Sequence, residues 1–175
     1  MHIIIRKEEV SDHEAVFNLV EKAFENEIYS DHQEQFLVER LRKSTAFVPE
    51  LAMVAELDGE VVGYTMLTKI QIVNAHTSAT SLALAPVAVL PAHQGKGIGG
   101  RLISAAHEKA TELGFGSVVL LGHENYYPRF GYELAGKFGI KLPFDVPAEN
   151  CMAIELVEGA LDNVSGVVEY PREFN

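Results

Sequence analysis

The sequence predicts a single mixed α/β domain. Its 175 residues are about the length of one domain with one sizeable core. The composition, 47% hydrophobic and 22% charged, is typical of a folded globular chain rather than a disordered one. Segments with apolar residues at helical spacing alternate with short apolar runs, and no repeat, linker or low-complexity tract separates them.

The N-terminal part predicts a short strand and then two helices. Residues 3–5 are a β-branched run, which favours a strand. Ser11 and Glu14 have the spacing of a capping box, which marks the start of a helix, and residues 30–33 repeat the cap signal. The apolar positions are Val16, Leu19, Val20, Ala23 and Phe24 in the first helix, and Phe36, Leu37 and Leu41 in the second.

The next part predicts strands. Residues 51–57 and 61–72 are rich in apolar and β-branched residues, and Asp58-Gly59 between them is a turn pair typical of a hairpin. The small, polar residues 74–81 predict a loop, and residues 82–90 predict a further strand.

The middle of the chain predicts a long amphipathic helix that ends at Gly114, a residue suited to a left-handed stop. Residues 118–121 then predict a buried strand. Residues 126–131 can form about one helical turn, with Pro128 near its start and Gly131 just past its end. The remainder predicts further strands. The apolar positions of the long helix are Ile98, Leu102, Ala105, Ala106, Ala110 and Leu113.

Net charge restricts the partners. Fourteen basic and 25 acidic residues give a net charge of −11, which disfavours nucleic acid and anionic membrane and favours a cationic small molecule or a basic peptide. The single cysteine, Cys151, excludes an internal disulfide and a thiolate metal cage, so no metal is expected. Neither a signal peptide nor a membrane-spanning run is evident, and we expect a reducing, cytoplasmic compartment.

The strongest local signal is the glycine-rich turn within residues 87–102, where a strand leads through a short loop into a helix. Glycines such as Gly95 and Gly97 let the backbone approach an anion closely. The free amides at a helix start, with Lys96 and Arg101 nearby, favour a phosphate or pyrophosphate group.

Three interpretations of this turn can be compared with the residues. Gly95, Gly97 and Gly100 satisfy G-x-G-x-x-G, and Glu124 lies at a suitable distance for a dinucleotide site. However, residues 91–94 separate the strand from the first glycine, whereas the dinucleotide fold places that glycine directly on the strand end. A Walker loop does not fit, because no Ser or Thr follows the lysine. A helix start without any ligand is the third interpretation.

Residues 94–99 resemble the Q/R-x-x-G-x-G/A motif of the GNAT superfamily of acyl-CoA-dependent N-acetyltransferases, and residues 87–91 resemble the strand before it. Residues 127–132 are similar to the family's Tyr-x-x-x-Gly-aromatic segment. The run from Tyr126 to Tyr132 most resembles a bacterial GNAT subgroup whose members are mostly labelled predicted acetyltransferases.

The order of the elements is similar to the GNAT order over roughly residues 3–156. This resemblance implies one GNAT domain over residues 1–157, with a mixed central sheet, splayed central strands and flanking helices. Residues 158–175 would be a tail or an edge element.

The resemblance also implies how the acyl donor, acetyl-CoA, is held. The pantetheine arm would lie like an extra strand beside Val87, Ala88 and Val89. Pro86 supports a bulge or an edge there, because proline cannot join a ladder. Backbone amides of the following loop would hold the pyrophosphate; its residues are Gln94, Gly95, Lys96, Gly97, Ile98 and Gly99.

In the GNAT mechanism an amine attacks acetyl-CoA directly, so Cys151 needs no nucleophilic role. An ammonium group with a pKa of ~10.4 must first lose a proton, at a cost of ~4.6 kcal/mol at pH 7. Tyr127 matches the tyrosine that protonates the departing thiolate as general acid; a core tyrosine is the alternative. Because residues 82–90 contain no carboxylate, Glu124 and His123 are the candidates for proton removal, with plain surface residues as the alternative.

Glu27, Tyr29 and His32 occupy the region that lines the acceptor site in many relatives, and we expect them to bind the amine of a small molecule or peptide. Pairing of relatives through their last strands makes a homodimer a candidate assembly. Two other functions stay open here. One is a GNAT fold that binds acyl-CoA without turnover, motivated by the missing strand carboxylate. The other is a dinucleotide-dependent oxidoreductase.

Overall fold

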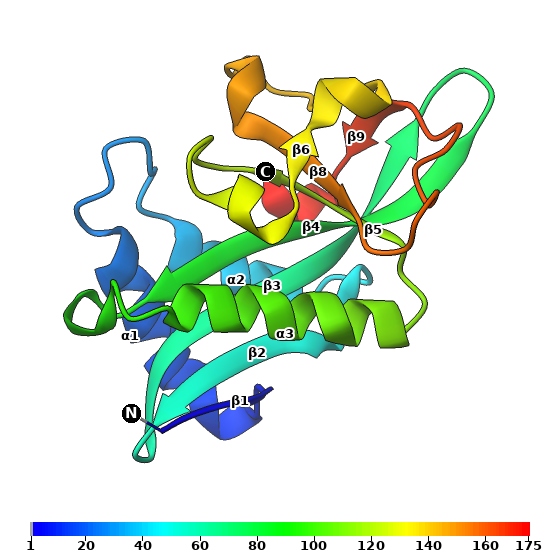
Figure 1. The fold of residues 1–175 in the computed structure, drawn as a ribbon. Helices are drawn as coiled ribbons and strands as arrows, with labels where there is room; N and C mark the ends of the chain where they lie inside the picture. The colour runs from blue at the N-terminus through cyan, green and yellow to red at the C-terminus, as the bar shows by residue number, and fades with distance from the viewer. Residues whose placement is uncertain (1) are drawn as a thin grey trace.

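The computed structural model describes residues 2–175, which form a nine-stranded mixed sheet with helices on both faces (Figure 1). The predicted α/β fold is therefore confirmed. The sheet order is β1-β2-β3-β4-β5-β8-β6, while β9 pairs with β3 and β7 pairs with β9. The strands are β1 (Ile3–Lys7), β2 (Phe47–Leu57), β3 (Glu60–Val73), β4 (Ser78–Val89), β5 (Ser117–Leu121), β6 (Glu133–Leu134), β7 (Ile140–Lys141), β8 (Cys151–Glu155) and β9 (Gly166–Glu169).

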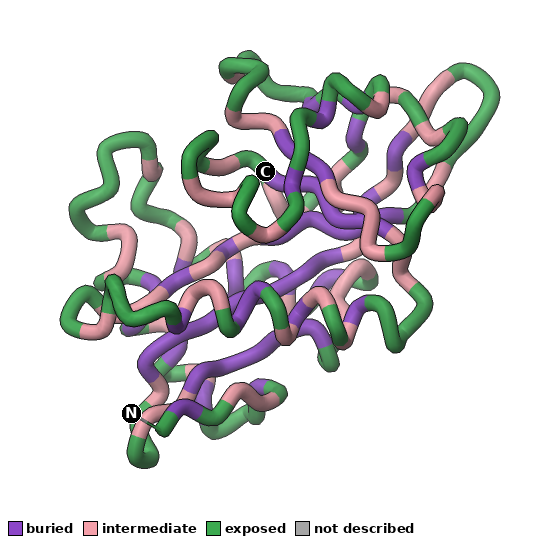
Figure 2. The backbone as a smooth tube through the Cα atoms, viewed as in Figure 1, coloured by how far each residue is buried: buried purple, intermediate pink, exposed green. Residues whose placement is uncertain are grey.

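Three α-helices cover the described sheet. Helix α3 (Ile98–Glu112) lies across one face, and α1 (His13–Phe24) and α2 (Glu34–Arg42) lie on the opposite face (Figure 1). Each face has its own hydrophobic cluster, one containing Leu102 of α3 and the other containing Leu19 of α1. Buried residues are concentrated in the long central strands between these helices (Figure 2).

Several turns form where the sequence predicts them. Asp58 and Gly59 have φ angles of +50° and +84° and connect β2 to β3, so the predicted hairpin is confirmed. Gly114, with φ +92°, follows the end of α3. The short 3₁₀ helix η3 (Tyr127–Phe130) ends at Gly131, with φ +99°. Glycine favours these positions because it carries no Cβ.

The predicted capping box at the first helix is wrong. Asp12 instead closes a capping box with Glu9 at the 3₁₀ helix η1 (Val10–Asp12), which leads into α1: its Oδ2 accepts a hydrogen bond of 2.8 Å from the backbone N–H of Glu9. Arg6 donates to both carboxylate oxygens of Asp12, at 2.8 and 2.9 Å. This ion pair with β1 holds the Asp12 carboxylate in place, and local spacing does not reveal such a contact between two elements.

Two further expectations need correction. β4 begins at Ser78, inside the predicted loop, because its first residue pairs with Val73 of β3. On α2 the buried face contains Val38 and Leu41, whereas Phe36 is exposed and packs edge-on against Phe17 of α1, with 5.3 Å between ring centroids. Pairing and helix packing therefore override the local polarity pattern.

The central parallel pair separates after a very short ladder. β4 and β5 pair only where Leu82 lies opposite Val118 and Ala83 lies opposite Val119. Beyond this point β5 pairs only with β8, and the remaining part of β4 pairs only with β3. The expected splay between central strands is thus present, and one edge of β4 is left without a strand partner.

A β-bulge accompanies the splay. The register between β3 and β4 shifts between Thr65 and Leu67, next to Pro86. The buried Thr65 hydroxyl donates a hydrogen bond of 3.0 Å to the carbonyl oxygen of Pro86. Because a bulge bends the strand that contains it, this arrangement directs the end of β4 away from β5.

Residues after position 157 are built into the sheet through β9. β9 pairs with β3 at Gln71 to Val73, beyond the last β2–β3 pair at Thr68, and Val168 is only 1% exposed. The 3₁₀ helix η6 (Arg172–Phe174) follows and lies against α2, where Arg40 Nε donates to the carbonyl oxygen of Glu173 at 3.0 Å. This segment therefore contributes to the core as an edge element.

Val168→Ala is expected to lower the free energy of unfolding by about 1–3 kcal/mol, because it removes buried methyl groups from the β9–β3 contact. Val167→Ala is the matched control, since Val167 points to the opposite face of the same strand and is 44% exposed. Its effect should stay within about 0.5 kcal/mol. Denaturant unfolding measures both variants, and equal losses would contradict the placement of β9.

Candidate active site

The free edge of β4 presents backbone groups toward the gap beside β5. The N–H of Leu90 donates to the carbonyl of Val62 in β3 at 2.9 Å. Because backbone groups alternate sides along a strand, Ala88 also directs its N–H and C=O toward β3. Val87 and Val89 direct theirs into the gap. Gln94 Nε2 donates to the Val89 carbonyl at 3.0 Å, which agrees with this assignment.

Of the three strand residues assigned to the pantetheine arm, Val87 has both backbone groups free in the gap, and Val89 has a free N–H while its carbonyl accepts from Gln94. The backbone of Ala88 is bonded to β3, and its methyl group is buried in the hydrophobic cluster that also contains Leu19 of α1, so Ala88 offers neither to the gap. The sequence could not separate these roles, because the alternation depends on the register with β3.

The loop between β4 and α3 presents consecutive free amides. The last N–H groups with partners are those of His93 and Gln94, which donate to Leu90 and Pro91 at 2.8 and 3.4 Å. The amides of residues 95–100 have no acceptor within residues 2–175, and the first bonded amide after them is that of Arg101. They lie at the positive end of α3 and can bind an anion.

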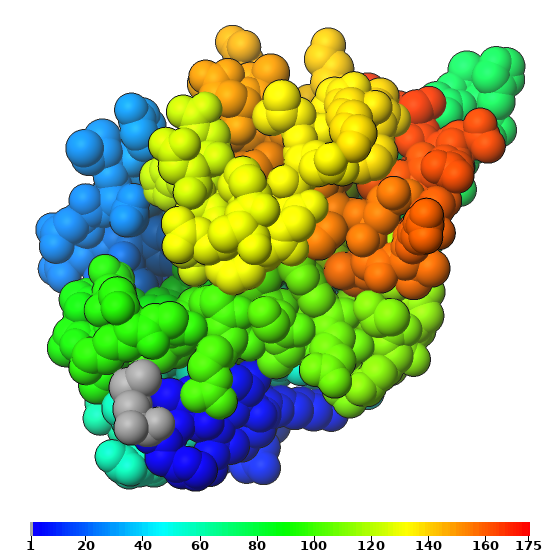
Figure 3. All heavy atoms as spheres, viewed as in Figure 1, coloured from blue at the N-terminus to red at the C-terminus, as the bar shows by residue number. Residues whose placement is uncertain are grey.

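The glycines of this loop have two different functions. Gly95 and Gly97 both have φ +78°, and a Cβ at either position would meet no atom, so these two are required by backbone conformation. Gly99 and Gly100 are required by packing: a Cβ would lie 3.1 Å from Tyr126 Oη and 3.2 Å from the Phe130 ring, respectively. The segment containing η3 is therefore in direct contact with the start of α3 (Figure 3).

The two basic residues near the free amides, Lys96 in the loop and Arg101 in α3, differ in whether they can reach a bound anion. Lys96 is exposed and makes no ion pair with any described residue. Arg101, in contrast, donates from Nη2 to the carbonyl oxygen of Ile3 at 3.0 Å, which fixes it against β1. Ile98 is buried beneath the loop, so it can offer only its backbone amide.

Tyr127 lies just past the end of β5, where its ring packs on Gly122 so closely that a Cβ there would overlap it. Burial raises the pKa of Tyr127 to about 12, so its hydroxyl keeps its proton at neutral pH. That hydroxyl makes no hydrogen bond with the part of the chain that the structure describes. A protonated, unengaged hydroxyl can donate a proton or a hydrogen bond to a ligand.

The candidates for proton removal lie at the surface, unlike the largely buried Tyr127. His123 and Glu124 are both exposed and make no side-chain hydrogen bond or ion pair within residues 2–175. Asn125 uses its carbonyl to accept a hydrogen bond of 3.3 Å from Arg129 Nη2. Water has free access to this segment.

The three predicted acceptor residues, Glu27, Tyr29 and His32, are all exposed on the loop between α1 and α2. Tyr29 lines a cavity of about 290 Å³, whereas Glu27 and His32 do not. Phe174, from the other end of the chain, also lines it and was not predicted. The complete lining is Tyr29, Asp31, Gln33, Glu34, Leu37, Arg40 and Phe174.

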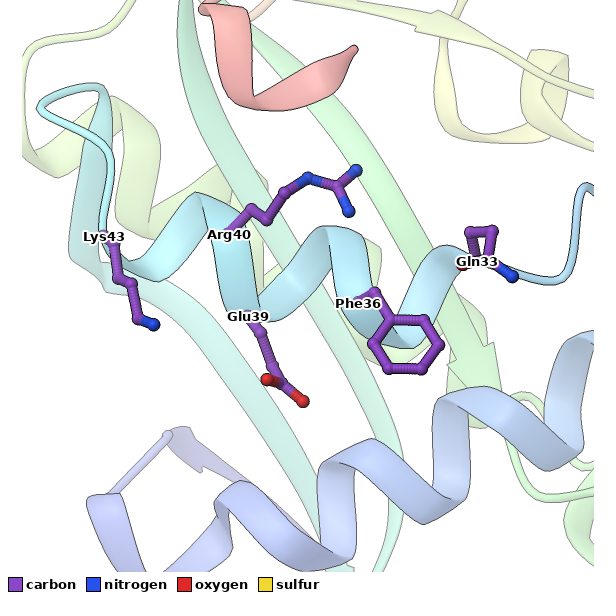
Figure 4. A pocket seen from close by; sticks show the side chains of 5 residues that line it. All are labelled: Gln33, Phe36, Glu39, Arg40 and Lys43. Atoms are coloured by element: carbon purple, nitrogen blue, oxygen red, sulfur yellow. The ribbon is translucent and has the colours of Figure 1, made fainter.

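A second hollow of about 400 Å³ lies on the outer side of α2 and shares Gln33 and Arg40 with the first. Figure 4 shows its side chains along α2, with Arg40 extending toward η6. It also contains Glu39 and Lys43, and Phe36 forms its apolar part. The mixed charges of this hollow resemble an ordinary helix surface.

Sequence reasoning missed a polar contact behind Tyr127. His107 Nε2 on α3 lies 2.7 Å from the hydroxyl oxygen of Tyr132, which follows η3. Burial lowers the pKa of His107 to about 4 and raises the pKa of Tyr132, so both groups are neutral at pH 7. A histidine on the polar side of a helical pattern gave no signal of this contact.

Within residues 2–175, no helix is long and apolar enough to cross a membrane. The same residues contain no group of three or more His, Cys, Asp or Glu side chains placed to hold a metal ion. The sheet is largely antiparallel, which does not match the doubly wound parallel sheet that the dinucleotide interpretation requires.

A mixed sheet that splits between two parallel strands, with a glycine-rich helix start beside the split, defines the fold of the acyl-CoA-dependent acyltransferases. The model of the acetyltransferase (GNAT) family matches residues 14–132. The chain therefore belongs to the GNAT family of N-acetyltransferases, as the two motifs predicted.

Two uncharacterized N-acetyltransferases of Escherichia coli K12 are similar to this chain. YjhQ is 33% identical over 146 residues, which cover 79% of this chain and 81% of YjhQ. YhbS is 27% identical over 173 residues, which cover 99% of both chains.

Solved structures of the family share the fold. The crystal structure of Escherichia coli YhbS in complex with CoA has a TM-score of 0.90 and 28% identity, covering 100% of this chain and 93% of YhbS. A GNAT acetyltransferase from Brucella melitensis in complex with acetyl-CoA has a TM-score of 0.82 and 32% identity, covering 99% of each chain.

The low pKa of His107 predicts a loss of stability in acid. The unfolded imidazole, with a pKa of 6.5, binds a proton that the folded one, with a pKa of about 4, excludes. The contribution of neutral His107 to the free energy of unfolding is therefore complete above pH 6.5 and is lost as the pH falls toward 4. Because the ring is only partly buried, we expect the free energy of unfolding to fall by about 1–2 kcal/mol over this range.

Unfolding of the wild type and His107→Gln, measured between pH 4 and 7.5, checks this. The variant should lose less stability than the wild type across that window. His123→Gln, which removes an exposed histidine, is the control and should follow the wild type. Parallel curves for the wild type and His107→Gln would show that His107 does not couple to folding.

Proposed function

We propose that this protein binds acetyl-CoA in the gap beside β4 and transfers its acetyl group to a primary amine. The observation that carries this proposal is that the edge of β4 at Val87 and Val89, which has no strand partner, is followed after the short helix η2 (Pro91–His93) by the free amides of residues 95–100. The first set suits the amide groups of a pantetheine arm, and the second suits a pyrophosphate. Two relatives of the same fold contain CoA and acetyl-CoA, respectively, which supports this cofactor.

In the proposed reaction, the nitrogen of a neutral amine attacks the thioester carbonyl, and a tetrahedral intermediate forms without an acyl-enzyme. The C–S bond then breaks, and the sulfur takes the proton of the Tyr127 hydroxyl to leave as the CoA thiol. The nitrogen loses its own proton, and Tyr127 regains one from solvent. The products are an amide and CoA. Tyr127, with a pKa of about 12, carries its proton at neutral pH, as a general acid must.

We assign proton removal from the incoming ammonium to the exposed segment that contains His123 and Glu124, with water as the carrier. This assignment is supported by the sequence of β4, which contains no carboxylate from Leu82 onward that could accept the proton. Glu124 precedes Tyr127 by three positions in the chain, which keeps base and acid in one segment.

The acceptor would bind at the cavity that Tyr29 lines. Asp31 and Glu34 provide carboxylates there, and Tyr29 and Phe174 provide aromatic surface. Carboxylates beside aromatic rings suit a cationic amine, which also agrees with the net charge of −11. Small polyamines and basic peptides are the substrate classes that fit this description.

A second candidate function is a GNAT module that binds acyl-CoA without turnover. The absence of a buried carboxylate among residues 82–90 favours it, because proton removal then rests on exposed groups alone.

Gly97→Glu is expected to weaken acetyl-CoA binding at least about tenfold relative to Gly97→Gln, measured by isothermal titration. Both substitutions place a side chain at φ +78° and strain the backbone equally. The difference between their affinities for acetyl-CoA therefore reports the effect of the negative charge beside the amides. NADH is titrated in parallel and should not bind. Equal affinities of the two variants for acetyl-CoA would contradict the assignment of the pyrophosphate to this loop.

Tyr127→Phe is expected to lower kcat about 100-fold, because general acid catalysis typically contributes that much, while the Kd for acetyl-CoA stays unchanged. Hydroxylamine serves as a small acceptor that is largely unprotonated near neutral pH, and released thiol is measured above the uncatalysed rate. Tyr170→Phe, from a separate aromatic cluster, is the control and should retain wild-type kcat. A wild type that binds acetyl-CoA but releases no thiol would favour the non-catalytic module.

A further inference from the structure

We propose that the hydrogen bond between His107 and Tyr132 is a positioning device that orients Tyr127 toward the thioester sulfur. This inference rests on the proposed role of Tyr127 as general acid. Neither His107 nor Tyr132 needs to contact the substrate, since both would act through the packing of the Tyr132 ring on the Tyr127 ring.

Tyr127 is held by rings on two sides. The ring of Tyr126 lies 5.1 Å away at 84°, and the ring of Tyr132 lies 5.8 Å away at 78°, both in edge-to-face geometry. Because the Tyr127 hydroxyl has no partner in the described chain, packing alone determines where it points. Whatever fixes Tyr126 and Tyr132 therefore fixes the proposed acid.

Both flanking rings are anchored on α3. The hydroxyl of Tyr126 reaches Gly99, in the first turn of the helix. The hydroxyl of Tyr132, in a side chain only 2% exposed, meets His107 at 2.7 Å. Gly99 and His107 are eight residues apart, about 12 Å along the helix axis. Two separate contacts on one rigid helix thus define the position of η3.

The hydrogen bond gives orientation that ring packing alone does not. Aromatic edge-to-face contacts tolerate sliding and tilting, whereas a hydrogen bond of 2.7 Å fixes a direction and a distance. The neutral state of the buried His107 agrees with a stable bond at assay pH. The same helix carries the amides proposed to bind the pyrophosphate, so cofactor and acid would share one frame.

The test measures hydroxylamine-dependent thiol release from acetyl-CoA by the full chain. Tyr132→Phe and His107→Leu each remove the bond and are expected to lower kcat about tenfold, with KM for acetyl-CoA within about twofold of wild type. His107→Gln keeps a polar group near the position of Nε2 and is expected to retain most of the rate. Tyr170→Phe is the matched control for loss of a tyrosine hydroxyl elsewhere.

Action through Tyr127 is tested in a second background. Tyr132→Phe combined with Tyr127→Phe is expected to be no slower than Tyr127→Phe alone, because the positioned group is already absent. A merely structural role would lower folding stability and reduce the rate equally in both backgrounds. Thermal unfolding of every variant confirms that the assay temperature lies below each transition.

The outcomes separate the two proposals. If Tyr127→Phe is slow but Tyr132→Phe and His107→Leu match the wild type, the positioning role is wrong and the general acid stands. If Tyr132→Phe adds its full loss in the Tyr127→Phe background, the positioning role is also wrong. If Tyr127→Phe itself matches the wild type, the general acid falls and the positioning role falls with it.

Discussion

The short ladder between β4 and β5 is the constraint on which the rest of this molecule depends. The two strands pair at Leu82–Val118 and Ala83–Val119 and then separate. A buried hydroxyl pair, Ser81 with Ser117 at 2.7 Å, joins them at the closed end. Because backbone N–H and C=O groups need partners, a strand that loses its neighbour inside a sheet must bind water or a ligand along the open part. The gap proposed to hold acetyl-CoA is thus a consequence of incomplete pairing rather than of a hollow lined by side chains.

Helix α3 connects the parts of the proposed site. Its first turn supplies free amides, its buried side covers the central strands, and its polar side meets the two tyrosines that flank Tyr127. The opposite face of the sheet, with the cavity that Tyr29 lines, is stabilised differently. There, Arg42 of α2 forms a partly buried ion pair with Glu8 at 2.6 Å, and η6 packs against α2. The two faces therefore depend on separate interactions, which allows the proposed acceptor cavity to vary while the proposed cofactor gap is retained.

Much of the site could be predicted because its geometry is local. Gly95 and Gly97 adopt φ angles that glycine favours, and Gly131 ends η3 for the same reason. Such positions depend on a few consecutive dihedral angles, and the spacing of the residues records them. The remaining roles depend on neighbours that are distant in the chain. The pairing of Ala88 with β3 follows from register, and the position of Phe174 in the cavity that Tyr29 lines follows from the path of β9 and η6.

By itself, the sequence determined the order of elements, the hairpin at Asp58-Gly59, the amide-rich start of α3 and the turn that carries Tyr127, since short-range dihedral preferences and periodicity encode all four. Tertiary structure decided the rest. It placed the capping box at Glu9 and Asp12 of η1 rather than at Ser11 and Glu14, and Arg6 on β1 holds the Asp12 carboxylate there. It also joined His107 to Tyr132, 25 residues apart, because α3 and the end of η3 pack on the same face of the sheet. A hydrogen bond between distant residues depends on where whole elements dock, and local spacing does not encode that position.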